Sequence, residues 1–203
     1  MISAKGVQDR PSGAGRIGEN NMRKLVVTEL VSLDGVMEEP GWTIPYRSDK
    51  STEFKRAESF ESDMLLLGRI TYEGFAQAWP NSTDKSADRM NSMPKYVVTT
   101  TLDTADWNNS TIIRENIMEE VTRLKQQDGG NILVYGSGVL VDSLMEAGLV
   151  DEYRLLIFPV VIGSGKRFFK DNRASKLKLA SSQSFDTGVV ALIYHPATQE
   201  EIK

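Results

Sequence analysis

Short apolar runs alternate with amphipathic helical patterns along most of the chain. The runs are rich in β-branched residues, which is typical of buried strands. They cover residues 24–32, 64–67, 96–98, 111–113, 132–135 and 153–161. Helical spacing of apolar residues predicts helices over 51–60, 71–78, 117–124 and 139–146. Asn116 is the expected N-cap of the third helix.

The stretch from residue 129 to 163 contains the clearest unit of this pattern. An apolar strand leads into Gly136-Ser137-Gly138, a helix follows, and Gly148 is a typical helix stop. Residues 153–161 are almost wholly apolar, which indicates a central strand rather than a half-exposed one. The unit is therefore strand, tight glycine turn, helix, strand.

The chain ends with two strand-like runs, 177–185 and 189–195, which a short turn suited to a hairpin connects. Alternating strands and helices followed by this hairpin predict one α/β domain with a mostly parallel sheet. We expect the domain to span residues 22–203. Residues 1–21 are polar and lack apolar periodicity, so they predict a flexible leader, and the ordered part is expected to begin at Met22.

Composition excludes several classes of protein. The chain of 203 residues has a net charge of −4, which gives no general attraction to nucleic acid or to an anionic membrane. It has no cysteine and one histidine, His195, which exclude disulfide scaffolds, thiol catalysis and cysteine- or histidine-rich metal sites. Nor is any apolar run long enough to span a bilayer. We expect a cytoplasmic protein that binds a small molecule, with no metal.

Three junctions offer groups that can bind an anion. Gly136-Ser137-Gly138 leaves backbone N–H groups free at a helix N-terminus, although the glycines could equally serve only a sharp turn. Val141 replaces the third glycine of the dinucleotide fingerprint, so a standard Rossmann domain is not indicated. Gly68, Arg69 and Thr71 place a guanidinium and a hydroxyl beside a second helix start, where Arg69 is either a phosphate ligand or a solvated surface residue.

The third junction is Thr99-Thr100-Thr101, whose hydroxyls suit a phosphate or ribose but also an ordinary strand end. In a parallel sheet the three junctions meet at the carboxyl edge, where ligands bind. Their coincidence is more informative than any one of them.

Four segments resemble a known family: VSLDGVM (31–37), LLLGRITYEGF (65–75), YVVTTTL (96–102) and GLVDEYRLLIFPVVIGSG (148–165). They resemble the dihydrofolate reductase-like superfamily, specifically the reductase domain of the bifunctional riboflavin-biosynthesis deaminase-reductase and its stand-alone relatives. The resemblance implies a three-layer α/β/α fold with a mostly parallel sheet of about eight strands and an antiparallel C-terminal hairpin. It also implies NADPH as hydride donor and a homodimer.

The resemblance assigns roles by position. The implied cofactor ligands are Gly68, Arg69, Thr71, Thr99, Thr100, Thr101, Tyr135, Gly136, Ser137, Gly138, Val139 and Leu140. The implied substrate ligands are Asp34, Gly35, Trp42, Phe54 and Glu58. Asp34 is the best available acid or substrate-orienting group, but it could equally cap its own turn. His195 is expected to be structural.

These assignments predict an NADPH-dependent reductase acting on a carbonyl or imine of a pyrimidine- or pterin-like molecule, as in 5-amino-6-(5-phosphoribosylamino)uracil reduction. A zinc deaminase domain is excluded, since its cysteine and histidine ligands are missing. Three alternatives stay open: a nucleotide-binding module without catalysis, a dihydrofolate reductase-type pterin reductase, and a flavin-dependent enzyme.

Overall fold

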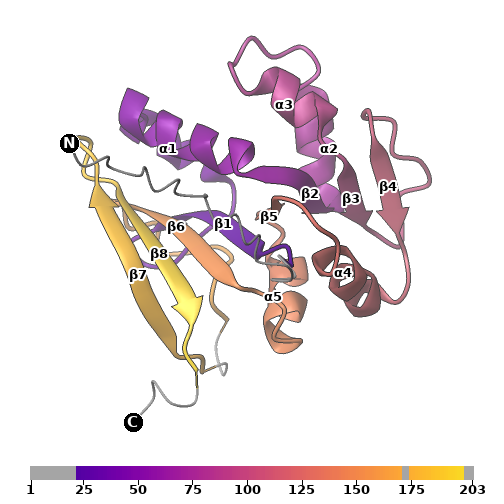
Figure 1. Cartoon of the computed structure of the whole chain (residues 1–203). Helices are drawn as coiled ribbons and strands as arrows, with labels where there is room; N and C mark the ends of the chain where they lie inside the picture. The colour runs from indigo at the N-terminus through magenta and orange to yellow at the C-terminus, as the bar shows by residue number, and fades with distance from the viewer. Residues whose placement is uncertain (1–21, 171–173, 199–203) are drawn as a thin grey trace, which may run out of the picture.

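A computed structural model describes residues 22–170 and 174–198 of the chain. Its framework is one eight-stranded sheet with the order β4-β3-β2-β5-β1-β6-β8-β7 (Figure 1). The strands are β1 (Leu25–Ser32), β2 (Ser62–Gly68), β3 (Lys95–Val98), β4 (Ser110–Ile113), β5 (Asn131–Tyr135), β6 (Glu152–Phe158), β7 (Leu177–Ser184) and β8 (Val190–Pro196). The predicted leader, residues 1–21, lies outside the described residues.

Strand β1 lies in the middle of the sheet and pairs in parallel with β5 on one side and β6 on the other. Strands β2, β3 and β4 continue the parallel part beyond β5. Strands β8 and β7 close the other side in antiparallel pairing. The predicted fold class is therefore confirmed, and all the parallel strands end at the same edge.

Helices cover both faces of the sheet and make three layers (Figure 1). They are α1 (Asp49–Phe60), α2 (Arg69–Ala78), α3 (Ala87–Ser92), α4 (Ile117–Lys125) and α5 (Gly138–Glu146), with a 3₁₀ helix η1 (Pro40–Tyr46). Successive residues of β1 point to opposite faces, as the strand period requires. Val27 packs in one cluster with Leu144 of α5, whereas Val26 packs in another with Tyr72 of α2.

Two details of the predicted elements differ from the structure for physical reasons: the end of β6 and the cap of α4. Strand β6 ends at Phe158 rather than at residue 161, because Pro159 has no N–H to donate to a ladder. Helix α4 does start after Asn116, but the Asn116 side chain makes no capping hydrogen bond. Its backbone is left-handed (φ 50°), which asparagine tolerates better than most residues.

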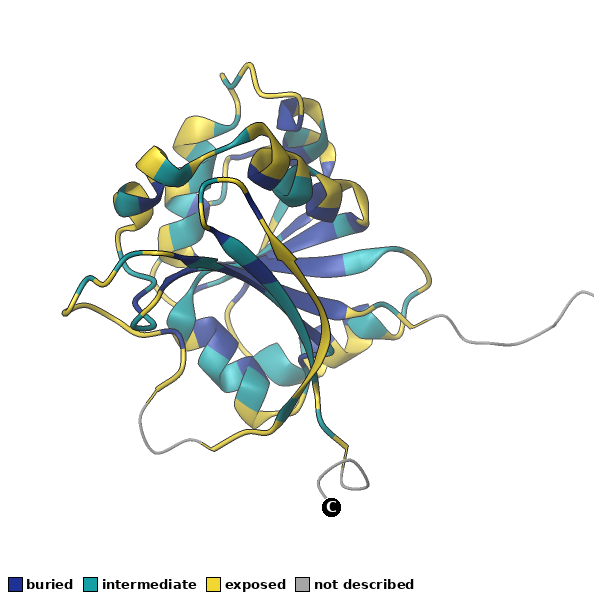
Figure 2. Ribbon diagram, turned by 90° about the vertical axis from the view of Figure 1, so that its left-hand side faces the viewer, coloured by how far each residue is buried: buried dark blue, intermediate teal, exposed yellow. Residues whose placement is uncertain are grey.

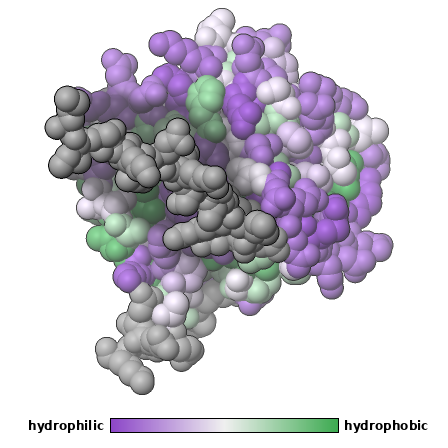
Figure 3. All heavy atoms as spheres, viewed as in Figure 1, coloured by the Kyte–Doolittle hydropathy of each residue, from purple (hydrophilic) through white to green (hydrophobic). Residues whose placement is uncertain are grey.

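Strand β7 is an edge strand, and most of its residues are exposed (Figure 2). The central strands are buried because helices cover both faces of the sheet. The face shown in Figure 3 is dominated by hydrophilic residues, with hydrophobic ones in small separate groups. Among the described residues, every helix is too short or too polar to cross a bilayer.

Candidate active site

A cleft of about 1710 Å³ opens along the carboxyl edge of the parallel strands. Its position follows from the topology, because the loops and helix starts that leave this edge diverge to opposite faces. All the residues predicted to bind a cofactor line it: Gly68, Arg69, Thr71, Thr99, Thr100, Thr101, Tyr135, Gly136, Ser137, Gly138, Val139 and Leu140. The structure thus brings the three predicted junctions together.

The β2–α2 and β5–α5 junctions touch each other. The backbone N–H of Gly68 donates to the Ser137 hydroxyl at 2.9 Å, and the Thr71 hydroxyl lies 2.9 Å from the same oxygen. A Cβ at residue 68 would lie 2.4 Å from that oxygen, so only glycine permits this approach. Gly136 and Ser137 both have positive φ. The contact holds two helix N-termini side by side at the cleft.

Arg69 and Thr99, two more of the predicted cofactor ligands, already have partners within the chain. Arg69 is partly exposed at the start of α2 and makes an ion pair of 2.9 Å with Glu73. The Thr99 hydroxyl is buried and accepts hydrogen bonds from the backbone N–H groups of Thr101 and Leu102, both at 3.1 Å. Thr99 therefore shapes the loop, while Thr100 and Thr101 are exposed and present their side chains to solvent.

Asp34 does not line the cleft. Its carboxylate accepts from the Ser32 hydroxyl (2.7 Å) and from the backbone N–H groups of Ile162 (3.1 Å) and Gly163 (2.8 Å). The Ser32 hydroxyl and these N–H groups lower the pKa of Asp34 to about 2. The geometry matches the turn-capping interpretation, because three donors of the chain itself already bind the carboxylate.

The remaining predicted substrate ligands also lie outside the cleft lining. Gly35 closes the turn after β1 by donating its N–H to the Ser32 carbonyl. Trp42 packs edge-on against Phe158 at a centroid distance of 5.5 Å, and Phe54 packs in the same way against Phe185 at 5.9 Å. Trp42 therefore packs η1 against β6, and Phe54 packs α1 against the residue that follows β7.

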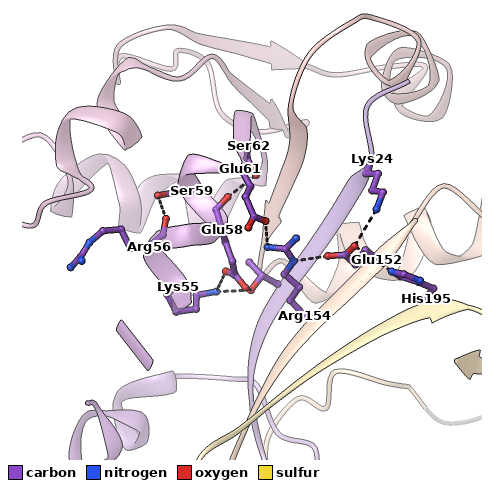
Figure 4. Close-up of polar contacts among 11 residues, drawn as sticks. Lys24, Lys55, Arg56, Glu58, Ser59, Glu61, Ser62, Glu152, Arg154 and His195 are labelled. Atoms are coloured by element: carbon purple, nitrogen blue, oxygen red, sulfur yellow. Dashed lines mark hydrogen bonds and ion pairs between the residues drawn. The ribbon is translucent and has the colours of Figure 1, made fainter. Parts of the chain in front are cut away.

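Glu58, on α1, is fully buried beneath the cleft. Its carboxylate accepts from the Thr28 hydroxyl (2.9 Å) and pairs with Lys55 (2.6 Å), as Figure 4 shows for the two α1 residues. The Lys55 Nζ also lies 2.5 Å from the Thr28 hydroxyl and 4.7 Å from the centre of the Tyr135 ring. Glu58 therefore acts on the cleft through Lys55, which does line it.

His195 lies elsewhere, near the end of β8 and beside the first residue of β6, rather than at the carboxyl edge of the parallel strands. Its Nε2 is 3.3 Å from Glu152, which also pairs with Arg154 at 2.6 Å (Figure 4). Arg154 reaches on to Glu61 at 2.7 Å. His195 does not line the cleft, as expected for a structural residue.

The residue that sequence reasoning missed is Glu29, in the middle of β1. It lines the cleft, is 7% exposed, and has one oxygen, Oε1, that accepts from the Leu30 N–H at 3.0 Å. The other oxygen, Oε2, is buried and has no partner. Burial raises the pKa of Glu29 to about 7, against the smaller opposing effects of the Leu30 N–H and the Lys55 charge. A lone glutamate inside an apolar strand run was the available signal.

Aromatic and basic side chains complete the lining. Phe75 contacts Trp79 and Tyr135, at centroid distances of 6.1 and 5.4 Å, and all three line the cleft. The basic residues of the lining are Arg47, Lys55, Arg56, Arg69, Lys166, Arg167 and Lys170. They outnumber the four acidic residues of the lining, Glu29, Glu38, Glu39 and Asp84, although five of the seven are in ion pairs. With this excess of basic groups and its aromatic wall, the cleft suits an aromatic, anionic ligand. The described residues include no cluster of histidine and carboxylate side chains that could hold a metal ion.

Comparisons with known proteins identify relatives in sequence and in fold. The uncharacterised protein YyaP of Bacillus subtilis is 34% identical over 188 residues, which cover 87% of this chain and 97% of YyaP. A pyrimidine reductase-like protein from Corynebacterium diphtheriae has a TM-score of 0.67 at 11% identity, over 88% of this chain and 94% of that one.

Dihydrofolate reductase from Enterococcus faecalis, solved with NADP(H), has a TM-score of 0.61 at 16% identity, over 86% of this chain and 97% of its own. At such identities the structures establish a common fold, the dihydrofolate reductase-like one. The family model described as the RibD C-terminal domain matches residues 23–191, most of the chain. The chain therefore belongs to the RibD C-terminal domain family.

Proposed function

We propose that this protein is an NADPH-dependent reductase that transfers a hydride to a carbonyl or imine carbon of a pyrimidine- or pterin-like molecule. One observation carries the proposal: two helix N-termini and the threonine junction converge on a single cleft that has an aromatic wall. Membership of the RibD C-terminal domain family supports a reductase of the riboflavin-biosynthesis type.

The residues of the cleft fit such a cofactor. The backbone N–H groups that follow Gly136 at the start of α5 suit its diphosphate, since helix N-termini stabilise anions. A side chain at Gly136 would approach Thr71 and Glu29, so glycine leaves this cradle open. Arg69, with Thr100 and Thr101 nearby on the cleft wall, suits the 2′-phosphate that distinguishes NADPH from NADH.

The substrate would lie in the part of the cleft that β1 and α1 border. Thr52, Lys55 and Ser59 of α1 face the cleft opposite residues 28–30 of β1, and they offer donors and acceptors to a polar heterocycle. The bound cofactor would supply the hydride. The chain's own residues would hold the accepting carbon in line with it and restrict water around it.

Arg69 provides the test of cofactor choice. In the Arg69→Ala variant we expect NADPH binding to weaken by about 1.5–3 kcal/mol, the usual range for a hydrogen bond to a charged group. The lower end is expected, because Arg69 must leave Glu73 to bind the phosphate. NADH binding should change far less. Calorimetric titration of both cofactors measures this, with Arg123→Ala, another exposed helical ion-pair arginine, as the matched control.

Turnover decides between a reductase and a binding module. NADPH oxidation should be followed with pterins, aminopyrimidine ribitol precursors and simple carbonyl compounds as acceptors. Oxidation that depends on one of these would support the proposal, whereas binding without any turnover would support a module without catalysis. Failure of the intact protein to bind either cofactor would contradict the proposal itself, and bound flavin in the absorbance spectrum would replace it with a flavin enzyme.

The proposal includes a symmetric homodimer. The edge strand β7 has no second neighbour among the described strands, and Leu179 on it is 49% exposed. Both features suit association with another copy. A monomer mass by light scattering at micromolar concentration would exclude a tight dimer.

A further inference from the structure

We propose that Glu29 is the proton donor of the reduction, giving a proton from Oε2 to the substrate atom that gains negative charge when the hydride arrives. This inference rests on the proposed reductase function and assigns a residue to a step for which Asp34 was the sequence-based candidate. It starts from the unpartnered oxygen on the floor of the cleft.

Geometry singles out Oε2 of Glu29. Polar atoms buried in proteins nearly always have a partner, so one without a partner at a ligand site points to a group that is supplied from outside. Oε1 is already held by the Leu30 N–H, which fixes the direction of the carboxyl group. Oε2 lies 3.6 Å from the place a Cβ of residue 136 would occupy. Gly136 therefore keeps the position next to Oε2 clear of a side chain.

The groups around Glu29 leave its carboxyl group able to carry a proton. Lys55 of α1 is the charged neighbour that favours the carboxylate, but its Nζ is already paired with Glu58. Thr71 of α2 is neutral, and burial raises the pKa of the Tyr135 phenol of β5, which stays neutral too.

On β6, Leu155 is the register partner of Glu29, and burial raises the pKa of the nearby Tyr153 to about 12. The desolvation of Glu29 is therefore the larger effect, and its pKa lies near 7. A general acid is most effective when its pKa lies near the working pH.

The proposed reduction adds a hydride and a proton to the C=O or C=N bond of the substrate. The hydride forms a new C–H bond at the carbonyl or imine carbon, and the π electrons of the C=O or C=N bond move to the oxygen or nitrogen. That atom takes the proton from Oε2, so the Glu29 O–H bond breaks as the new O–H or N–H bond forms. The substrate is reduced, NADPH is oxidised to NADP⁺, and the Glu29 carboxylate regains its proton from water.

A first test needs no substrate. Protein labelled with ¹³C at the glutamate carboxyl groups is titrated by NMR. We expect one glutamate to titrate near pH 7 in the wild type and to be missing from Glu29→Gln, while Glu119→Gln, an exposed α4 control, retains it. A wild-type spectrum in which every glutamate titrates below pH 5.5, about one unit above the ordinary value, would overturn the proposal.

The second test is kinetic and uses the acceptor that the substrate panel identifies. In Glu29→Gln we expect NADPH affinity to be retained and turnover to fall by roughly 10²–10⁴-fold, the usual contribution of a general acid. Wild-type turnover should fall as pH rises through about 7, and this dependence should vanish in Glu29→Gln and partly return in Glu29→Asp.

The outcomes separate the two proposals. Wild-type turnover that Glu29→Gln leaves intact, or an unchanged pH profile in that variant, would overturn the role of Glu29 alone. A wild-type protein that binds no NADPH or reduces no acceptor would overturn the reductase function, and the role of Glu29 with it.

Discussion

The middle of β1 and the turn that follows it each carry one carboxylate, and the two groups are opposites. Asp34 is partly exposed, yet the Ser32 hydroxyl and two backbone N–H groups bind its oxygens and lower its pKa to about 2. Glu29 is buried, has one oxygen without a partner, and has a pKa raised to about 7. Hydrogen bonds stabilise the charged form of Asp34, whereas burial destabilises the charged form of Glu29. Partners and burial, rather than position in a loop, decide which carboxylate can act as an acid.

The largest expected effect comes from removing Lys55, which acts on both Glu29 and Glu58. Lys55→Met leaves the buried Glu58 carboxylate with the Thr28 hydroxyl as its remaining partner. We expect the free energy of unfolding to fall by about 3–5 kcal/mol, as for other broken buried pairs. Urea denaturation measures the loss.

The double variant Lys55→Met/Glu58→Gln is the matched control. It should recover most of the stability, since it leaves no uncompensated buried charge. In the same double variant the pKa of Glu29 should rise further, because the Lys55 charge that lowers it is gone. A pKa of Glu29 that falls or stays constant would contradict the electrostatic account of this site.

A second effect concerns the pH dependence of stability. The pKa of Glu29 is raised from 4.5 to about 7 on folding, so the folded state binds more protons between these values. The free energy of unfolding contributed by this group is therefore highest below pH 4.5 and is lost as pH rises through about 7. Glu29→Gln removes that loss. We expect the variant to gain about 3 kcal/mol over the wild type between pH 4 and pH 8.

Melting curves of the two proteins at a series of pH values check this. Glu119→Gln, which removes an exposed carboxyl group of α4, is the matched control. A constant difference between Glu29→Gln and wild type across the series would mean that Glu29 does not change its pKa on folding.

The smallest effect is expected at Asp34. Its pKa is lowered on folding, so its contribution to stability is present above pH 3.8 and is lost as pH falls towards 2. Asp34→Asn should therefore lower the melting temperature at neutral pH and reduce its fall in acid. Turnover should drop by less than about tenfold, well below the loss of a general acid. A larger drop at unchanged NADPH affinity would restore Asp34 as the catalytic acid.

The fold and the convergence of three junctions on one cleft could be predicted because local sequence encodes them. Apolar runs locate the strands, and glycine or threonine at a strand end marks a junction that a parallel sheet brings to one edge. The pairing of Gly68 with Ser137 could not be foreseen, since it depends on how two distant loops meet. Gly68, the residue that permits this contact, was nevertheless recognisable in the sequence as the end of a strand.

The part of the cleft along β1 and α1 was harder to predict because it depends on the surroundings of single side chains. Strand alternation shows that Thr28 and Glu29 point to opposite faces, but not that Glu29 Oε2 is left without a partner. Glu58 was expected to bind a substrate, although in the structure it is buried against Lys55 and Thr28. Such facts arise only from tertiary packing.

The place of β1 in the sheet has a consequence for synthesis on the ribosome. Leu25 pairs with Ile132 and Val26 with Glu152, so the first strand made has both neighbours in the second half of the chain. Until β5 has left the exit tunnel, both edges of β1 are open, and one edge stays open until β6 follows. During this time its apolar sequence is exposed to other chains. Contacts so distant in sequence slow folding and extend the period in which aggregation competes with it. Nascent chains stopped before residue 152 should therefore bind chaperones that the finished protein does not.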